Sequence, residues 1–189
     1  MTDARSALAR WGAELRLART LRLRWRVRAA ALAALVIGVA ATIVGPPRPL
    51  LVWNASASAP IGLYLVGDPE RAARDAMVVA WPPRAVRPLA ARRRYIPLNV
   101  PLVKRVAAVA GDTVCADGPT IRINGQPVVQ RLPRDGAGRA MPWWHGCVTL
   151  GKDAVFLLMT GSPASFDGRY FGPSRRGELV GTARPLWSR

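Results

Sequence analysis

The sequence has few of the residues that most catalytic centres and metal sites use. Its 189 residues include a single His, two Cys and only 11 Asp and Glu. A Ser-His-Asp triad would have to use His145, which lies between two Trp and Cys147, and a packing or surface role is the better interpretation there. Zinc sites need His, Cys or carboxylate ligands at short spacings, and the sequence has no such pattern. The sequence therefore predicts no metal and no cofactor.

Lysine is nearly absent as well. Of the 28 basic residues only Lys104 and Lys152 are Lys, so the other 26 are Arg. Arg stays protonated near neutral pH, whereas burial can lower the pKa of a Lys far enough to make it a base. Lys104 has apolar neighbours apart from Arg105, whose side chain would point to the opposite face of a strand. Lys152 lies in a Gly-Lys-Asp turn, where a solvated, charged Lys is expected.

The basic residues are concentrated at the start of the chain. Residues 1–28 contain eight Arg against Asp3 and Glu14, and the next sixteen residues, 29–44, carry no charge. This run is shorter than the ~20 residues that usually cross a bilayer, but Arg28 can extend to the lipid headgroups. The pattern predicts a cytoplasmic segment (1–28), a single transmembrane anchor in the inner (cytoplasmic) membrane (29–46) and an extracytoplasmic, periplasmic domain (47–189).

A cleaved signal peptide is the alternative interpretation of this segment. Ala55, Ser56 and Ala57 form the small-residue pattern of a cleavage site. We favour an uncleaved anchor, because the charged region is long for a signal peptide and the uncharged run exceeds a normal apolar core. Both interpretations export the rest of the chain.

Export would place the two cysteines in a compartment where disulfides form. Cys115 and Cys147 lie 32 positions apart, and in an oxidising compartment the pair is expected to form a disulfide. Two unpaired, buried cysteines are the alternative. The closed region, 115–147, contains the Gly-, Pro- and Arg-rich segment 131–144, which looks like an insertion.

The residues after the anchor predict a mainly β domain. The segment Gly45–Pro49 should end the helix, and short apolar runs bounded by Gly, Pro, Asp and Asn are typical of strands. The runs predicted as strands are 50–53, 63–66, 77–81, 100–103 and 155–159. Residues 121–129 predict a hairpin, because Asn124-Gly125 suits a type I′ turn. The Arg- and Pro-rich residues 82–97 are predicted to be a loop.

A serine–lysine dyad is the catalytic chemistry that remains available. It requires an exposed hydroxyl on a turn, a neutral Lys and donors for an oxyanion. The segment Asn54–Tyr64 carries Ser56 and Ser58 in a small-residue turn with Pro and Gly. On composition alone, an ordinary Ser/Ala loop is the better interpretation.

Three segments resemble the conserved boxes of one family. Asn54–Tyr64 resembles the pattern N-x-S/T-x-S-x-P-x-G-L-Y, 103–114 resembles K-R-V-x-x-x-x-G-D-x-V, and 165–173 resembles S-x-D-S-R-Y-x-G. These are the boxes of the conjugative-transfer signal peptidases (TraF type), relatives of bacterial signal peptidase I. The resemblance implies a signal peptidase-like, β-rich catalytic domain with one N-terminal transmembrane helix.

The resemblance also implies roles for individual residues. Ser58 matches the nucleophile and Lys104 the general base, while Ser56 matches the residue whose hydroxyl helps to hold the oxyanion. Ser165 matches the hydroxyl that orients the lysine, and Asp167 and Arg169 match a supporting ion pair. Two positions depart from the family: Gly168 replaces the commoner Ser, and Ala110 replaces a frequent Pro.

The expected function is a membrane-anchored serine endopeptidase that processes exported, pilin-type precursors for conjugative transfer. The resemblance implies that strands beside the dyad bind an extended substrate, with shallow pockets for small side chains. It leaves open whether the acyl-enzyme is hydrolysed or cyclised by the substrate's own amino terminus. Membrane lipid and components of a type IV secretion apparatus are the other expected partners. Trp53 is expected either at the lipid interface or in the core.

Two other functions compete with this one. A general signal peptidase I would use the same dyad on many secreted proteins. A non-enzymatic module that binds DNA or anionic lipid would account for the net charge of +11 that residues 29–189 carry, with 20 basic against 9 acidic residues. No nucleic-acid-binding motif accompanies that charge, so nucleic acid is not an expected partner.

Overall fold

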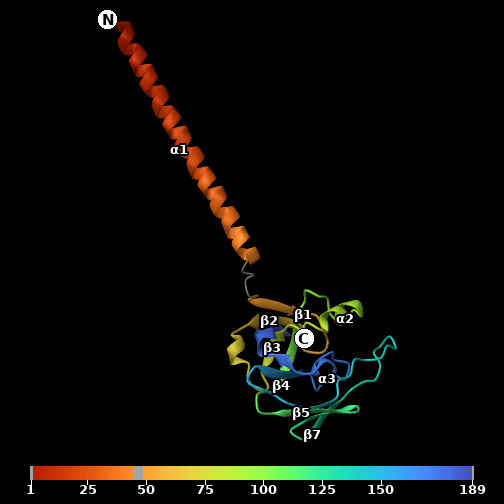
Figure 1. Ribbon diagram of the computed structural model, residues 1–189. Helices are drawn as coiled ribbons and strands as arrows, with labels where there is room; N and C mark the ends of the chain where they lie inside the picture. Colours follow the sequence, from red (N-terminus) through yellow and green to blue (C-terminus); the bar gives the residue numbers. More distant parts are fainter. Residues whose placement is uncertain (1, 45–48, 189) are drawn as a thin grey trace. The chain divides into compact units, whose positions relative to one another are not determined.

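The computed structural model describes residues 2–44 and 49–188, which belong to two separate compact units divided after residue 48. In the first unit a single helix, α1 (Thr2–Val44), is drawn in red to orange in Figure 1. Its sequence consists mainly of Ala, Leu and Arg, which are strong helix formers. Most of the segment predicted to end the helix, residues 45–48, lies outside the described residues, so that prediction stays untested.

One part of α1 fits a membrane anchor. Residues Arg22–Thr42 are long and apolar enough to cross a bilayer, with a mean hydropathy of 1.5. All the side chains of this span are exposed in the structure, as expected of a helix that has lipid as its partner. The domain boundaries at residues 28 and 46 remain predictions.

The second unit is mainly β, as the sequence predicts. Its larger sheet has seven strands, each antiparallel to its neighbours. In spatial order these are β1 (Leu51–Asn54), β2 (Gly62–Val66), β11 (Leu179–Ser188), β3 (Met77–Ala80), β4 (Leu102–Ala108), β9 (Ala154–Leu158) and β10 (Ser174–Arg175). The chain enters at one edge, and its last strand returns to the interior of the sheet between β2 and β3.

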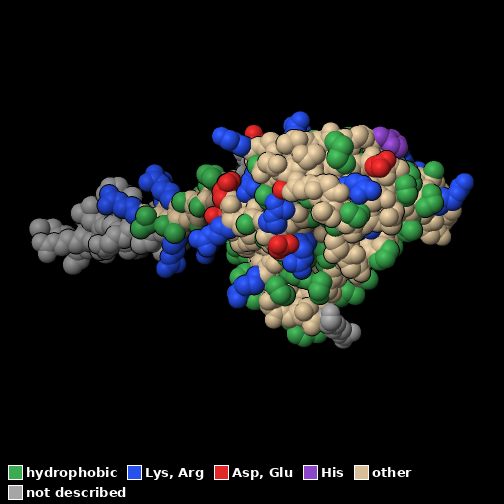
Figure 2. Space-filling view, turned by 90° about the horizontal axis from the view of Figure 1, so that it is seen from below, with side chains coloured by type: hydrophobic (Ala, Val, Ile, Leu, Met, Phe, Trp, Pro, Cys, Tyr) green, Lys and Arg blue, Asp and Glu red, His purple; other side chains and the backbone are tan. Residues whose placement is uncertain are grey.

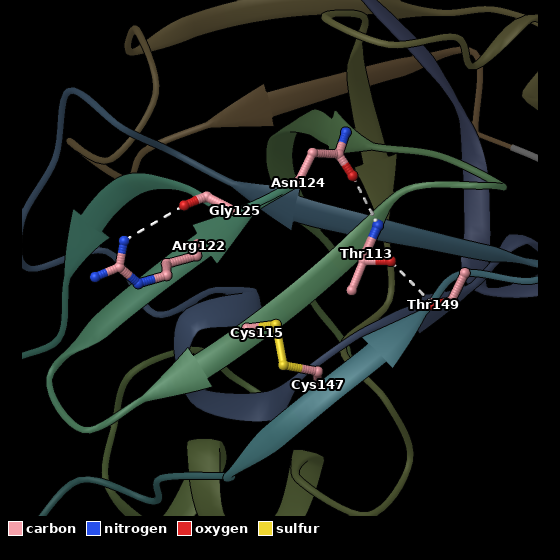
Figure 3. Close-up of a disulfide and its surroundings, with 7 residues drawn as sticks. All are labelled: Thr113, Cys115, Arg122, Asn124, Gly125, Cys147 and Thr149. Atoms are coloured by element: carbon pink, nitrogen blue, oxygen red, sulfur yellow. Dashed lines mark hydrogen bonds between the residues drawn. A yellow bond between two sulfur atoms is a disulfide. The ribbon is translucent and has the colours of Figure 1, made fainter.

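The smaller sheet has four antiparallel strands. Their order is β7 (Gln126–Gln130), β6 (Thr120–Ile123), β5 (Thr113–Asp117) and β8 (Gly146–Thr149). The β6–β7 hairpin confirms the predicted turn, because Asn124 and Gly125 have φ values of 51° and 80°, both positive as a type I′ turn requires. The Asn124 side chain also accepts a hydrogen bond from the backbone N–H of Thr113 at 2.9 Å (Figure 3).

The predicted disulfide is present and joins the two neighbouring strands β5 and β8. Cys115 and Cys147 lie opposite each other in the register of these strands, and their sulfur atoms are bonded (Figure 3). The bond closes a loop with a sequence separation of 32 residues, which stabilises a fold by about 3–4 kcal/mol in the chain-entropy model. The closed region is more than an inserted loop, because it contains β6, β7 and most of the smaller sheet.

The two sheets share a hydrophobic core. One cluster combines Ala108 of β4 and Phe156 of β9 with Val114 and Ile121 of the smaller sheet, all fully buried. A second cluster combines residues of β3, β4 and β9, among them Val78, Val106 and Leu157. Strand β4 therefore lies at the centre of the packing, and Figure 1 shows it between the upper strands and β5.

Two predictions about local structure were imprecise. The strand predicted at 100–103 begins at Leu102 and continues to Ala108, because apolar residues extend beyond Lys104. The loop predicted at 82–97 contains a short helix, α2 (Arg87–Arg92), with Pro88 in its first turn, where a missing N–H costs nothing. The other short helices are η1 (Pro69–Arg71), α3 (Gly168–Phe171) and η2 (Arg176–Glu178).

Candidate active site

Ser58 lies on the turn that joins β1 to β2, and a single buried side chain organises this turn. The amide nitrogen of Asn54, the last residue of β1, donates hydrogen bonds to the carbonyl oxygens of Ser56, Ala59 and Pro60 at 3.0, 3.1 and 3.0 Å. Its amide oxygen accepts one from the backbone N–H of Ser56 at 3.1 Å. Asn54 therefore replaces the backbone partners that the irregular turn lacks.

The far end of the turn is fixed by Tyr64 and Gly62. The Tyr64 hydroxyl donates a hydrogen bond to the carbonyl oxygen of Pro60 at 2.7 Å, and its ring is buried. At Gly62 a Cβ atom would lie 2.0 Å from the carbonyl oxygen of Trp187 on β11, so only glycine fits the close approach of the two strands. Asn54, Gly62 and Tyr64 were absent from the predicted site, although all three lie in the box Asn54–Tyr64.

Lys104 projects from β4 toward this turn. Its Nζ atom donates hydrogen bonds to Ser58 Oγ at 2.6 Å and to Ser165 Oγ at 2.9 Å. Only 2% of Lys104 is exposed, whereas its neighbour Arg105 is exposed and donates to the carbonyl oxygen of Asp75 at 2.7 Å. The alternation of a strand thus separates the two basic side chains, as the sequence predicts.

Burial changes the acid–base behaviour of the Lys104 amine. The pKa of Lys104 is lowered from its ordinary value of 10.5 to about 8, first because burial disfavours the charged form. The charge of Asp167 raises this pKa and that of Arg169 lowers it, so the two oppose each other. A substantial fraction of the amine is therefore neutral at slightly alkaline pH, and its lone pair can accept a proton from the adjacent Ser58 hydroxyl.

Ser56 lies on the other side of Ser58. The Oγ atoms of the two serines are 3.0 Å apart, and the backbone N–H of Ser58 donates to Ser56 Oγ at a long 3.4 Å. The weakly engaged N–H and the exposed Ser56 hydroxyl are two donors beside the same hydroxyl oxygen. Donors in this arrangement can stabilise an oxyanion that forms on a carbonyl attacked by Ser58.

Asp167 and Arg169 form a fully buried ion pair with several further hydrogen bonds. Arg169 Nε donates to Asp167 at 2.8 Å, and its terminal nitrogens donate to the carbonyl oxygens of Pro163 and Met159 at 3.0 and 2.6 Å. Asp167 also accepts from the backbone N–H of Met159 at 3.1 Å. The pair thereby holds together the segment that carries Ser165.

The departure from the family pattern at Gly168 has a steric reason. A Cβ atom at this position would lie 2.7 Å from the carbonyl oxygen of Leu157 and 2.8 Å from the ring of Phe156. The carbonyl oxygen of Gly168 in turn accepts a hydrogen bond from the Trp144 indole at 3.0 Å. A Ser at position 168 would require β9 to move away, so packing against β9 explains why this chain has Gly there.

Three pockets meet at Ser58. The first pocket, of about 360 Å³, is lined by residues that include Lys104, Ser165 and Tyr170. The second pocket, of about 350 Å³, is lined by residues that include Trp53 and Val100. A third, of about 380 Å³, lies along the residues after Ser58 and contains Ile61 and Met159. Ser58 is therefore accessible from several directions.

The remaining candidate residues lie elsewhere. His145 and Lys152 are both exposed, and neither lines the pockets at Ser58. Within the described residues, no three His, Cys, Asp or Glu side chains form a group that could hold a metal ion. On the face drawn in Figure 2, Lys and Arg side chains are separated by hydrophobic and acidic ones, as on a solvated basic surface.

The chain belongs to the signal peptidase family, peptidase S26, whose family model matches residues 22–187. This membership supports a serine peptidase and confirms the resemblance inferred from the three boxes.

Two relatives from Escherichia coli place the chain more closely, among the TraF-type members. Both are called plasmid transfer protein TraF. One is 34% identical over 143 residues, covering 70% of this chain and 80% of the relative. The other is 33% identical over 164 residues, covering 82% and 89%. A signal peptidase I from Enterococcus faecalis V583, known from its crystal structure, is 20% identical to this chain. The match covers 58% of this chain and 95% of that one, with a TM-score of 0.33.

We predict that the buried amine destabilises the folded protein. The pKa of Lys104 is lower in the folded than in the unfolded chain, so the unfolded chain binds the proton more tightly. Below pH 8 the lowered pKa of Lys104 costs about 3 kcal/mol of folding stability. This cost disappears as the pH rises from about 8 to about 10.5. Lys104→Met should therefore raise the free energy of unfolding at neutral pH and progressively less at alkaline pH.

Chemical denaturation of the full chain in detergent, at pH values from neutral to alkaline, measures this difference. Lys152→Met is the matched control, because Lys152 is exposed and its replacement should give no pH-dependent change. A Lys104→Met chain that is less stable than the wild type at neutral pH would contradict the prediction.

Proposed function

We propose that this protein is a membrane-anchored serine endopeptidase in which Ser58 is the nucleophile and Lys104 the general base. The observation that carries the proposal is the buried Lys104 amine, 2.6 Å from Ser58 Oγ and with a pKa lowered to about 8. A desolvated Lys beside a Ser hydroxyl is a known way to activate a nucleophile without His.

In the acylation step Ser58 Oγ attacks the carbonyl carbon of the scissile peptide bond. Neutral Lys104 accepts the hydroxyl proton as the oxygen–carbon bond forms, then delivers it to the leaving amine as the carbon–nitrogen bond breaks. Ser165 orients the amine through the 2.9 Å hydrogen bond. The developing oxyanion is stabilised by the backbone N–H of Ser58 and the hydroxyl of Ser56.

The acyl-enzyme must then be released. In hydrolysis, water gives its proton to Lys104 and attacks the ester carbon, and Ser58 leaves with that proton. In cyclisation the amino terminus of the substrate takes the place of water. Asp167 and Arg169 support both routes indirectly, since their hydrogen bonds hold the segment of Ser165 and their charges act on Lys104.

The substrate we propose is an exported, pilin-type precursor used in conjugative transfer. The names of the relatives, plasmid transfer proteins, support this choice over a general signal peptidase. A protein substrate would reach Ser58 as an extended chain beside strands β1 and β4, whose ends line the second pocket. Components of a conjugation apparatus would deliver it.

We further propose that the anchor is retained in the inner membrane and that the β domain faces the periplasm. The eight Arg of residues 1–28 support a cytoplasmic amino terminus. The disulfide supports an oxidising compartment for the domain. Cleavage at Ala55–Ala57 would separate β1 and Asn54 from the turn that Asn54 organises, which argues against removal of the anchor.

Ser58→Ala and Lys104→Ala should each abolish processing of a co-expressed pilin precursor, with losses of at least about 10³-fold. Lys152→Ala, which removes the other lysine, should process normally. Mass spectrometry of the product measures the outcome and also separates the two release routes, because a cyclic product is lighter by one water. Normal processing by either dyad variant would overturn the proposed function.

Processing should also depend on pH through Lys104. Since only the neutral amine acts as base, kcat/KM should rise with pH and level off above a midpoint near the lowered pKa of about 8. Initial rates on a peptide that spans the cleavage site, measured between neutral and alkaline pH, test this. A rate that is constant through this range would exclude Lys104 as the titrating base.

The proposed orientation predicts an oxidised cysteine pair in living cells. Cells are lysed directly in denaturant that contains a maleimide. The maleimide should label Cys115 and Cys147 only after reduction, because the periplasm maintains disulfides. A Cys147→Ser chain, in which Cys115 has lost its partner, is the control that should be labelled without reduction. Labelling of the wild-type chain without reduction would place the domain in a reducing compartment.

A further inference from the structure

The first and second pockets beside Ser58 share a wall. Five residues line both pockets: Ser56, Ser58, Leu102, Lys104 and Tyr95. Three of them belong to the proposed dyad and oxyanion site, and Leu102 is the first residue of β4. Tyr95, which follows α2, is the one aromatic side chain of the five, and it comes from outside the catalytic machinery.

Tyr95 is held in place from three sides. Its hydroxyl donates a hydrogen bond to Asp135 Oδ2 at 2.6 Å, its ring centroid lies 4.9 Å from that of Phe166, and the Arg139 guanidinium lies 5.7 Å from the ring. Arg139 also donates to Asp135 at 2.7 Å. An aromatic ring with these contacts has one defined position.

Asp135 and Arg139 belong to one segment, residues 131–144, which joins β7 to β8 and which we call the arm. The Asp135 side chain is 7% exposed and also accepts hydrogen bonds from the backbone N–H groups of Ala137 and Arg139. The arm is tied to the α2 segment by Arg93, which donates to the carbonyl oxygen of Ala140 at 2.7 Å.

The base of the arm is anchored as well. Arg131 donates to the carbonyl oxygens of Trp144 and Gly118, and the backbone N–H of Leu132 donates to the Tyr170 hydroxyl at 3.0 Å. Leu132 and Met141 of the arm line the first pocket. The arm is therefore part of the pocket itself.

We propose that Tyr95 is a specificity-determining residue, the wall that divides the two substrate side-chain pockets beside Ser58, and that Asp135 of the arm is the positioning residue that holds it there. The inference rests on the proposed function, because it assigns the pockets to side chains of a bound peptide. Removing the ring would join pockets of about 360 and 350 Å³ into one larger cavity. Fixing the ring through Asp135 sets how large a side chain each pocket accepts.

The test uses tripeptide aldehydes, which report on the pockets without turnover. Ser58 Oγ adds to the aldehyde carbon, and the hydroxyl proton passes through Lys104 to the new hemiacetal oxygen. One series varies the residue at the aldehyde end among Ala, Leu and Trp, and a second varies the residue two positions earlier. Thermal-shift titration of the full chain in detergent gives a Kd for each aldehyde.

In Tyr95→Ala the enlarged cavity should favour the large side chain. The Kd for the Trp aldehyde divided by the Kd for the Ala aldehyde should therefore fall by about tenfold or more in at least one series. Tyr95→Phe removes the bond to Asp135, whereas Asp135→Ala also removes its bonds to Arg139 and Ala137; each should lower the ratio by a smaller factor than Tyr95→Ala. In the Asp135→Ala background, Tyr95→Phe should add nothing, because the carboxylate that accepts from the Tyr95 hydroxyl is already gone. Trp81→Ala, a change away from these pockets, should leave the ratio unchanged.

The outcomes separate the inference from the proposed function. Binding that depends on Ser58, with a ratio unmoved in Tyr95→Ala, would overturn the role of Tyr95 and leave the peptidase intact. Additive effects of Tyr95→Phe and Asp135→Ala would overturn the positioning role of Asp135. If Ser58→Ala binds every aldehyde as well as the wild type, both the function and the inference fail. If Tyr95→Ala does not fold, the two milder variants and their double carry the test.

Discussion

The arrangement of the site depends on keeping the Lys104 amine out of water. Lys104 is 2% exposed and has hydroxyl groups as its hydrogen-bond partners, so nothing next to it fully compensates a positive charge. The nearby carboxylate of Asp167 could do so, but it is bonded to Arg169, and the opposite charges of this pair offset each other at the amine. The buried ion pair thus supplies hydrogen bonds that fix the segment of Ser165, while its two charges act on the pKa of Lys104 in opposite directions. Such a site keeps its lysine titratable near neutral pH.

This constraint explains why the site is assembled from the centre of the fold. Ser58, Lys104 and Ser165 come from a turn at the sheet edge, the central strand β4 and the segment after β9, and long-range pairing brings them together. The buried face of β4, formed by Leu102, Val106 and Ala108, gives Lys104 its apolar surroundings, while the turn leaves Ser58 partly exposed. The buried Lys104 amine and the more accessible Ser58 hydroxyl can meet because Asn54 fixes the turn that carries Ser58.

Much of this could be predicted from the sequence, because local signals were strong. Apolar runs between turn residues predicted β1, β2, β3 and β9, and Asn124-Gly125 predicted the hairpin. Strand β11 could not be found in this way, since Gly181, Arg184 and Pro185 interrupt its apolar pattern and it forms through pairing with β2 and β3. The site residues came from three boxes. Tyr95 and Asp135 lie outside every box, and their connection depends on a contact across 40 positions.

The scarcity of lysine has a practical consequence for studying the molecule. With Arg at 26 of the 28 basic positions, isotopic labelling of lysine would give just two side-chain amine signals in a nuclear magnetic resonance spectrum. One would come from the exposed Lys152 and one from the buried Lys104, which differ in solvation and hydrogen bonding. The titration of the buried Lys104 amine, the proposed general base, could then be followed directly, with an internal reference supplied by the same chain.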